Sequence, residues 1–329
     1  MKRKGILIYI LLFFAAALIC PWIGSESLPL SELKQLFNGQ PDTSSEIFWF
    51  QRLPRVWLAL LAGAALAVVG AAFQVLFRNP LVEPFTLGVS GGASLGAFLT
   101  LSLPSLWITW GPFSSVQLFA LAGAAGSLFL IYSLARHPLG MSIYTLLLAG
   151  ITISIICGGA ILLLTYLANP NVLVTFQRWL MGGIDITGYQ ELAAILPLLL
   201  PSLGLLFYHS RDLNHIALGE DMALGHGVDV KAVQRNVFIG GGMATAMVVS
   251  VVGPIGFVGL IIPHIVRRLS GYDQRRVLSG SFFLGGAVLA FCDALARKIL
   301  SPMELPVGII TAIIGGPIFI YLLVSRRWR

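Results

Sequence analysis

The chain has 329 residues, of which 57% are apolar and only 11% are charged, and its mean hydropathy is +0.88. Soluble domains carry about 25% charged residues, so this composition argues against a soluble protein and predicts a polytopic membrane protein. The formal charge of +7 comes from short basic clusters between apolar runs, which is typical of the positive-inside bias and not of a nucleic-acid-binding face. Strand-type alternation is absent, so we expect helices, not a barrel.

Apolar runs in chain order predict the membrane spans. Lys2, Arg3 and Lys4 precede the first run, in which Ile19 occupies a position where signal cleavage needs a small residue, so we expect a retained helix over Ile6–Ile23. Further spans are expected at Val56–Phe77, Thr86–Leu103, Val116–Ala135, Ile143–Ala168, Leu192–Tyr208, Val277–Leu295 and Leu305–Val324. Two stretches, 25–51 and 169–190, are expected as outer loops, the first with an amphipathic helix over Leu28–Phe37.

The run Asn236–Val266 has no Asp, Glu, Lys or Arg, yet it is long for one crossing and short for two. Gly253-Pro254 breaks it near the middle. Basic residues flank both sides, so the positive-inside bias predicts two crossings, the second of them short. The total is then about ten helices in a single domain over residues 1–329, with both termini cytoplasmic. This orientation places few of the 21 basic residues outside: Lys34, Arg52, Arg55, Arg178, Arg297 and Lys298.

A polar segment, about residues 211–231, separates two apolar runs on the side predicted to be cytoplasmic. Its centre, Leu218–Lys231, combines charged residues with glycines, which are typical of loop and helix boundaries: Glu220, Asp221, Asp229, Lys231, Gly219, Gly225 and Gly227. Gly225 is expected to make a turn that a bulky residue would spoil. From these residues alone, a plain inter-helix loop and a contact surface for a soluble partner remain equally open.

Sequence signatures of catalysis are weak. The chain has no Gly-Lys-Ser/Thr phosphate loop, so it is not expected to hydrolyse ATP by that route, and its histidines show no metal-ligand spacing. The cysteines Cys20, Cys157 and Cys292 lie in apolar runs and are expected to be inert. We therefore expect no catalytic residue, no metal site and no cofactor bound by this chain.

Asp293 and Arg297 are four positions apart, so they can pair on one face of a helix. A local ion pair is favoured over the alternative, a proton relay of an ion-coupled transporter. Small residues recur at helical spacing in four spans and indicate close helix packing, with a translocation path as the alternative. These stripes are Gly63/Ala67/Gly70, Gly88/Gly92/Gly96, Gly241/Thr245 and Gly308/Ala312/Gly316.

Motifs in order along nearly the whole chain resemble the FecCD family, the permeases of ABC importers for iron–siderophores, haem and vitamin B12. The first half carries Arg52-Leu-Pro-Arg55, Gly70-Ala-Ala-Phe-Gln74, Arg78-Asn-Pro-Leu-Val-Glu-Pro84 and Leu87-Gly-Val-Ser-Gly-Gly-Ala-Ser-Leu-Gly96. The second half carries Gly253-Pro-Ile-Gly-Phe-Val-Gly-Leu260, Pro263-His264, Arg267, Asp293, Ala296-Arg297, Glu304-Leu-Pro-Val-Gly308 and Gly315-Gly-Pro-Ile-Phe319.

The resemblance implies a BtuC-like all-α permease fold in the cytoplasmic membrane of a bacterium. It also implies partners: a second permease subunit, identical or different, two cytoplasmic ATPase subunits that bind ATP and Mg, and an extracytoplasmic solute-binding protein. An iron–siderophore is the expected cargo, with haem and cobalamin still open. The main alternative, an ion-coupled secondary transporter, would work without an ATPase.

Site residues follow from the same resemblance. Coupling to the ATPase is expected at Leu218, Gly219, Glu220, Asp221, Ala223, Leu224, Gly225 and Val228. Docking of the binding protein, through its glutamates, is expected at Arg52, Arg55 and Arg297, because guanidinium groups suit carboxylates; the alternative for Arg52 and Arg55 is that they anchor the second span at the interface. The translocation path or its packing is expected at Gly88, Gly91, Gly92, Gly96, Gly253 and Pro254.

Overall fold

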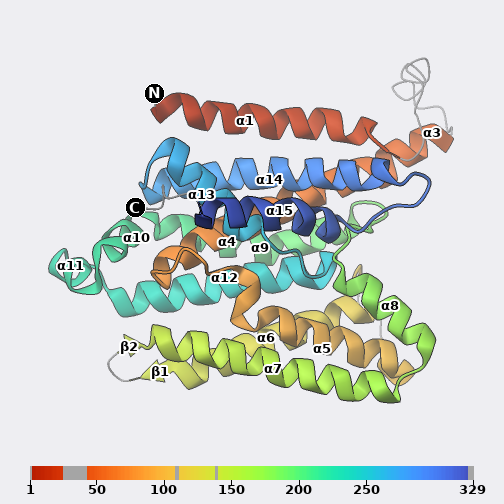
Figure 1. Cartoon of the computed structure of the whole chain (residues 1–329), viewed down its shortest axis with the longest axis horizontal. Coiled ribbons are helices and arrows are strands. Elements are labelled where there is room, and N and C mark those ends of the chain that lie inside the picture. The colour runs from red at the N-terminus through yellow and green to blue at the C-terminus, as the bar shows by residue number, and fades with distance from the viewer. Residues whose placement is uncertain (1, 25–42, 108–110, 138–139, 325–329) are drawn as a thin grey trace.

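A computed structural model describes residues 2–24, 43–107, 111–137 and 140–324 (Figure 1). Over these residues the chain is helical apart from one antiparallel pair of two-residue strands, β1 (Arg136–His137) and β2 (Gly140–Met141). The longer helices are α1 (Lys2–Ile19), α4 (Leu53–Leu76), α5 (Val89–Ser102), α6 (Ser115–Ala135), α7 (Ile143–Leu167), α8 (Pro170–Leu180), α9 (Gln190–Tyr208), α10 (Ser210–Leu218), α12 (Val230–Val252), α13 (Val258–Ser270), α14 (Gln274–Ile299) and α15 (Val307–Val324). Short helical segments are η1 (Cys20–Trp22), α3 (Thr43–Glu46), η2 (Ile47–Arg52), η3 (Pro84–Leu87), η4 (Pro104–Leu106) and α11 (Glu220–Gly225).

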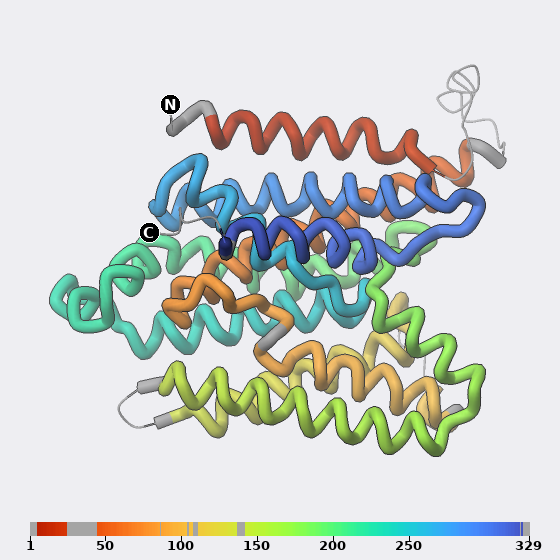
Figure 2. The backbone as a smooth tube through the Cα atoms, in the orientation of Figure 1, coloured from red at the N-terminus to blue at the C-terminus, as the bar shows by residue number. Residues whose placement is uncertain are grey.

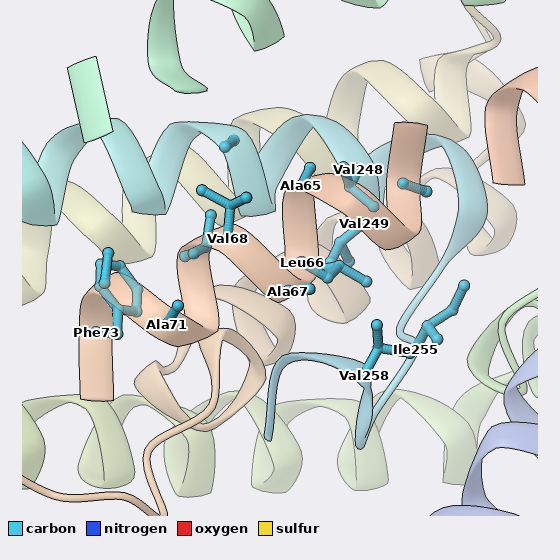
Figure 3. Close-up of a cluster of buried hydrophobic side chains, with 14 of the residues drawn as sticks. Ala65, Leu66, Ala67, Val68, Ala71, Phe73, Val248, Val249, Ile255 and Val258 are labelled. Atoms are coloured by element: carbon cyan, nitrogen blue, oxygen red, sulfur yellow. The ribbon is translucent and has the colours of Figure 1, made fainter. Parts of the chain in front are cut away.

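Helix α4 is the centre of the bundle. It is built almost entirely from Ala, Gly, Val and Leu, and nearly all of its residues are buried. Helices α9, α12, α13 and α14 pack around it, and α1 lies outside α14 (Figure 1). Apolar side chains of α4, of α12, of the α12–α13 connection and of the start of α13 form one buried cluster (Figure 3): Ala65, Leu66, Ala67, Val68, Ala71, Phe73, Val248, Val249, Ile255 and Val258.

Glycines let the backbones of neighbouring helices touch. A Cβ atom on Gly63 would overlap the backbone carbonyl of Gly285 in α14, and one on Gly70 would overlap the backbone of Gly259 in α13. Helices in a membrane associate mainly through such packing, because lipid tails offer no hydrophobic driving force between them. The small-residue stripe of α4 is therefore a packing surface.

A second group of helices, α5, α6 and α7, lies beside this central bundle (Figure 1). Gly92 of α5 faces the carbonyl of Gly123 in α6, and Gly96 faces the carbonyl of Phe119, so α5 and α6 also meet backbone to backbone. The α5 stripe thus has the same physical role as the stripe of α4.

Polar side chains fix the starts of several helices. Ser114 and Gln117 form a reciprocal capping box at α6, and the hydroxyl of Ser142 accepts from the backbone of α7. Asp229 and Asp273 cap α12 and α14 in the same way. Such caps replace hydrogen bonds that the first turn of a helix cannot make internally.

The charge-free run Asn236–Val266 forms two helices, as the Gly253-Pro254 break predicts. Gly253 ends α12 with φ of 69°, a conformation that glycine adopts without strain, and α13 begins after Phe257. The carboxylate of Glu83 accepts from the backbone N–H of Phe257 and so caps α13 from a distant part of the chain. At about 1.5 Å per residue, α13 is about 20 Å long, shorter than a bilayer core of about 30 Å.

Among the described residues, seven helices are long and apolar enough to cross a membrane. They are Gly5–Trp22, Ile47–Leu76, Ser115–Ala135, Ile143–Leu167, Gln190–Tyr208, Val230–Val252 and Gln274–Ile299, and two shorter apolar helices are Val89–Ser102 and Val307–Leu322. All nine overlap predicted spans, but Ile47–Leu76 begins inside the stretch 25–51 that was expected as an outer loop. The stretch 169–190 contains α8, which was not predicted, and the amphipathic helix expected over Leu28–Phe37 lies outside the described residues.

The bundle has two distinct ends, which we call the α11 end and the α8 end. Figure 2 shows α10 and α11 at one end, the left of the view, and α15 runs toward the same side. Helix α8 and the α14–α15 linker lie at the other end (Figure 1). Any functional surface at one end must therefore communicate with the other through the packed helices.

Replacing Gly70 by Ala is expected to destabilise the protein, because the added methyl group must push α13 away from α4. Overpacking of this kind costs about 1–3 kcal/mol. The matched control is Gly158→Ala in α7, where a Cβ meets nothing within 4 Å. Thermal unfolding in mild detergent should show a lower midpoint for Gly70→Ala only; equal midpoints for the two variants would contradict the packing role of Gly70.

Candidate functional site

The polar segment at the α11 end folds as two short helices joined by a glycine. Gly219 separates α10 from α11 with φ of 130°, and Gly227 follows α11 with φ of 77°, so both positions favour glycine. Gly225 differs from the expectation: it is the last residue of α11, has no positive φ, and a Cβ there meets nothing within 4 Å. The turns of this segment are thus made by Gly219 and Gly227, and a side chain at Gly225 would point into open space.

Helix α11 presents apolar side chains outward although it lies in a polar segment. Ala223 is fully buried and holds the helix against the protein, and its carbonyl accepts from the backbone N–H of Val228. Met222 and Leu224 are 53% and 58% exposed, and Leu218 at the end of α10 is more exposed still. Met222 lies within the predicted coupling segment, although it was not named among the individual coupling residues. Exposed apolar side chains grouped with charged ones are typical of a protein–protein contact.

Polar contacts tie α11 to two other parts of the bundle. Glu220 lies 3.4 Å from the guanidinium of Arg78, in the turn that follows α4, and its Oε1 accepts from Gln234 of α12 at 3.3 Å. Arg78 is distant from Glu220 along the chain, whereas Gln234 lies 14 residues after it in the next helix. A displacement of α11 would therefore pull on the end of α4 and the beginning of α12.

Helix α10 is held by a separate set of hydrogen bonds. Asn214 donates to Asp273 at 3.1 Å and accepts from the backbone N–H of Gln274 at 2.8 Å, which joins α10 to the start of α14. His209 contacts both Asp212, at 2.8 Å, and Asn236 of α12, at 3.2 Å. The α10–α11 pair is thus connected to α4, α12 and α14, which belong to the central bundle.

At the α8 end, three arginines gather around two carboxylates. Asp293 of α14 is fully buried and lies 3.1 Å from the Nε atom of Arg297, so the predicted ion pair on one helix face is confirmed. Arg55 at the start of α4 donates to the same carboxylate through Nε and Nη2 at 3.0–3.2 Å. Its remaining nitrogen, Nη1, donates to Glu304 in the α14–α15 linker at 2.6 Å. The role of Glu304 was not predicted, although the motif that contains it was recognised.

These arginines are mostly buried within the chain. Arg297 also donates to the backbone carbonyl of Cys20 at 3.2 Å, and Arg52 is buried beside Gly24. A cleft of ≈ 410 Å³ nevertheless opens onto all three, lined also by Gln51, Asp185 and Glu304. A second cleft of ≈ 280 Å³ shares Arg55, Asp185 and Glu304 with the first. The Arg55–Glu304 pair therefore borders both clefts.

The glycines predicted for the path or its packing all lie at close contacts. Gly88 has φ of 80° and faces the backbone of Gly150 in α7, and Gly91 faces Ser154 of the same helix. Gly253 lies against the backbone carbonyl of Trp179 at the end of α8, and Pro254 follows in the α12–α13 break. Close helix packing thus explains why small residues occupy these positions in the single chain. Their contribution to a translocation path stays a prediction.

Comparisons with known proteins agree with one another. The sequence model of the FecCD transport family matches residues 9–325. The chain is 43% identical to an uncharacterized ABC transporter permease protein, YvrB, of Bacillus subtilis over 84% of this chain and 78% of that protein. It is 35% identical to the hemin transport system permease protein HmuU of Yersinia pestis, covering 96% and 95%, and 37% identical to the cobalamin import system permease protein BtuC of Halobacterium salinarum, covering 94% and 81%.

A solved structure gives the same result for the fold. It is described as an inward-facing conformation of a metal-chelate type ABC transporter, and it superposes with a TM-score of 0.84 at 30% identity over 99% of this chain and 100% of that one. The likeness therefore extends over the complete arrangement of helices.

Replacing Asp293 by Ala is expected to cost about 3–5 kcal/mol, because it leaves Arg55 and Arg297 without the carboxylate that they share inside the protein. Asp185→Ala is the matched control, since Asp185 and its partner Arg178 are exposed and lie 3.8 Å apart. Such an exposed pair contributes about 0–1 kcal/mol. The measurement is thermal unfolding in detergent at low and high salt. A similar small loss for both variants would show that Asp293 is not a structural centre.

Proposed function

The chain belongs to the FecCD transport family and is a permease of the ABC-importer type, and from this premise we propose that it carries an iron–siderophore across the cytoplasmic membrane of a bacterium. Two ATPase subunits on the cytoplasmic side bind ATP and Mg, and the permease itself binds no cofactor. An extracytoplasmic solute-binding protein delivers the cargo. A second permease subunit, identical or different, completes the membrane part within the lipid bilayer.

The single observation that carries the ATPase contact in this proposal is the exposed apolar surface of α11. Met222 and Leu224 project from a segment that is otherwise charged, at the end of the molecule where α1 begins and α15 finishes. A soluble ATPase with an apolar groove would bury these side chains, and the acidic Glu220 and Asp221 would form the rim of the contact. Residues 211–231 are then the coupling segment, with Leu218, Gly219, Ala223, Gly225 and Val228 shaping it.

Orientation follows from this assignment. With the α11 end in the cytoplasm, both termini are cytoplasmic, and the stretches 25–51 and 169–190 face outward as part of one domain over residues 1–329. The seven long apolar helices, the two shorter ones and α13 give about ten crossings. Most basic residues outside the apolar helices then lie on the cytoplasmic side, in agreement with the positive-inside bias.

The contacts of the coupling segment provide the route by which movement of the ATPases is transmitted to the membrane helices. When the ATPases change their separation, α11 moves with them and pulls on Arg78 and Gln234, while α10 pulls on Asp273 at the start of α14. Helices α4, α12 and α14 are closely packed, so they respond as units and not by continuous deformation. The permease is thereby biased between inward-open and outward-open states.

The ATPase contact is tested by substitution on α11. Met222→Asp combined with Leu224→Asp should reduce recovery of the ATPase about tenfold or more when detergent-solubilised permease is used as bait, because two exposed apolar contacts become charged. Met303→Asp is the control, because Met303 is also an exposed apolar residue but lies in the linker at the opposite end. Equal recovery with all baits would contradict the assignment of α11.

The cargo is tested by uptake into proteoliposomes that contain the complete assembly. We expect ATP-dependent accumulation of ⁵⁵Fe-labelled siderophores from a panel of hydroxamate and catecholate compounds, and no comparable uptake of haem or cobalamin. Collapse of the proton gradient should leave uptake unchanged, since the energy comes from ATP. Uptake of haem or cobalamin alone would overturn the cargo proposal, and uptake that depends on the proton gradient would revive the ion-coupled mechanism.

A further inference from the structure

Arg55 uses its guanidinium group in two unequal ways. Its Nε and Nη2 atoms face Asp293, which is fully buried on α14 and shared with Arg297. Its Nη1 atom faces Glu304, which is 35% exposed and lies in a linker outside any helix. The Arg55–Asp293 contact is shielded from solvent, because Asp293 is fully buried. The second contact is open to competition from a carboxylate in solution.

The charges of this pair and its neighbours balance while Glu304 stays in place. The two guanidinium groups of Arg55 and Arg297 are matched by the two carboxylates of Asp293 and Glu304, and the cleft opens onto both arginines. The other carboxylate of the cleft, Asp185, lies beside Arg178. If Glu304 moved away, Arg55 and Arg297 would share the single carboxylate of Asp293, and one positive charge would lack a partner in a partly enclosed space. An incoming acidic side chain is the group that this cleft would then favour.

We propose that Glu304 is an intrachain substitute for a carboxylate of the solute-binding protein, and that docking displaces it from Arg55 and so releases the linker between α14 and α15. The inference rests on the proposed function and assigns a regulatory contact to its docking surface. Arg55 exchanges one carboxylate for another, so no charge is left buried without a partner during the exchange. Part of the favourable free energy of docking therefore offsets the loss of the Arg55–Glu304 contact that holds the linker.

The linker connects this exchange to the rest of the permease. Leu305 donates to the carbonyl of Ala296 at 3.2 Å, and α15 begins two residues later. Gly308 in the first turn of α15 donates to Gly182 at 3.1 Å, and the next residue, Gly183, donates to Val252 at the end of α12 at 2.9 Å. Release of Glu304 thus reaches the α12–α13 break through a continuous set of backbone contacts.

The test measures binding of the cognate solute-binding protein to the intact permease–ATPase assembly in nanodiscs at low salt. Glu304→Gln removes the competitor and should tighten binding by about fivefold or more. Asp185→Asn is the matched control, because Asp185 lines the same clefts and loses the same charge but has no contact with Arg55. We expect it to tighten binding by less than about twofold, the effect of net charge alone.

Both substitutions are repeated in an Arg55→Gln background, where Glu304→Gln should lose its advantage over Asp185→Asn. An equal effect of the two substitutions in the wild-type background, or weaker binding of Glu304→Gln, would overturn the exchange. Failure of the wild-type assembly to bind the solute-binding protein at all would instead contradict the proposed function. Reversing Arg55 to Glu is not a clean test, because it would place a third carboxylate beside Asp293 and Glu304.

A spin label on Met303→Cys reports on the linker directly and does not need the Arg55 variant to fold. Met303 is exposed, whereas the native cysteines are buried and should react slowly. The label should become more mobile when the solute-binding protein binds the wild-type assembly, and should already be mobile in Glu304→Gln without it. Asp185→Asn should behave as wild type. Unchanged mobility on docking would overturn the proposed release.

Discussion

Backbone contact between α4 and its neighbours is the constraint on which the rest of the structure depends. Gly63 and Gly70 place α4 directly against the backbones of α14 and α13, at separations that no residue with a Cβ atom allows. In lipid, where apolar side chains gain little from meeting one another, such close packing replaces the hydrophobic effect as the source of specificity. It also makes the central helices move together, which a coupled transporter needs.

The breaks in the helices need polar groups, because backbone that leaves a helix inside the bundle must still find hydrogen-bond partners. Glu83 caps α13, the side-chain amide of Gln74 donates to the carbonyls of Gly259 and Leu260, and Arg267 donates in turn to Gln74 and to Ala71. These polar residues therefore lie where α4 packs against α13. They connect the α12–α13 break to the centre of the bundle.

The two ends of the molecule differ in the interactions that their exposed surfaces can make: apolar contact at the α11 end and ion pairing at the α8 end. At the α11 end, exposed apolar side chains sit on short helices that are hydrogen-bonded to α4, α12 and α14, which suits a contact that must transmit force. At the α8 end, the guanidinium groups of Arg55 and Arg297 are paired with the carboxylates of Asp293 and Glu304. A balanced network with one exposed member can respond to an external charge without leaving any group uncompensated.

Composition, apolar runs and glycine positions determined much of this protein by themselves. They predict a helical membrane protein, place all seven long apolar helices, and mark the break at Gly253-Pro254, because lipid demands long apolar helices and because glycine and proline interrupt them. The spacing of Asp293 and Arg297 likewise predicts their ion pair, since residues four apart share a helix face. Only the tertiary structure decided that Arg55 and Glu304 join that pair, that Glu83 caps α13, and that the turns of the α10–α11 segment fall at Gly219 and Gly227. These features join residues as many as 249 positions apart, or depend on backbone angles, and local sequence patterns carry no record of either.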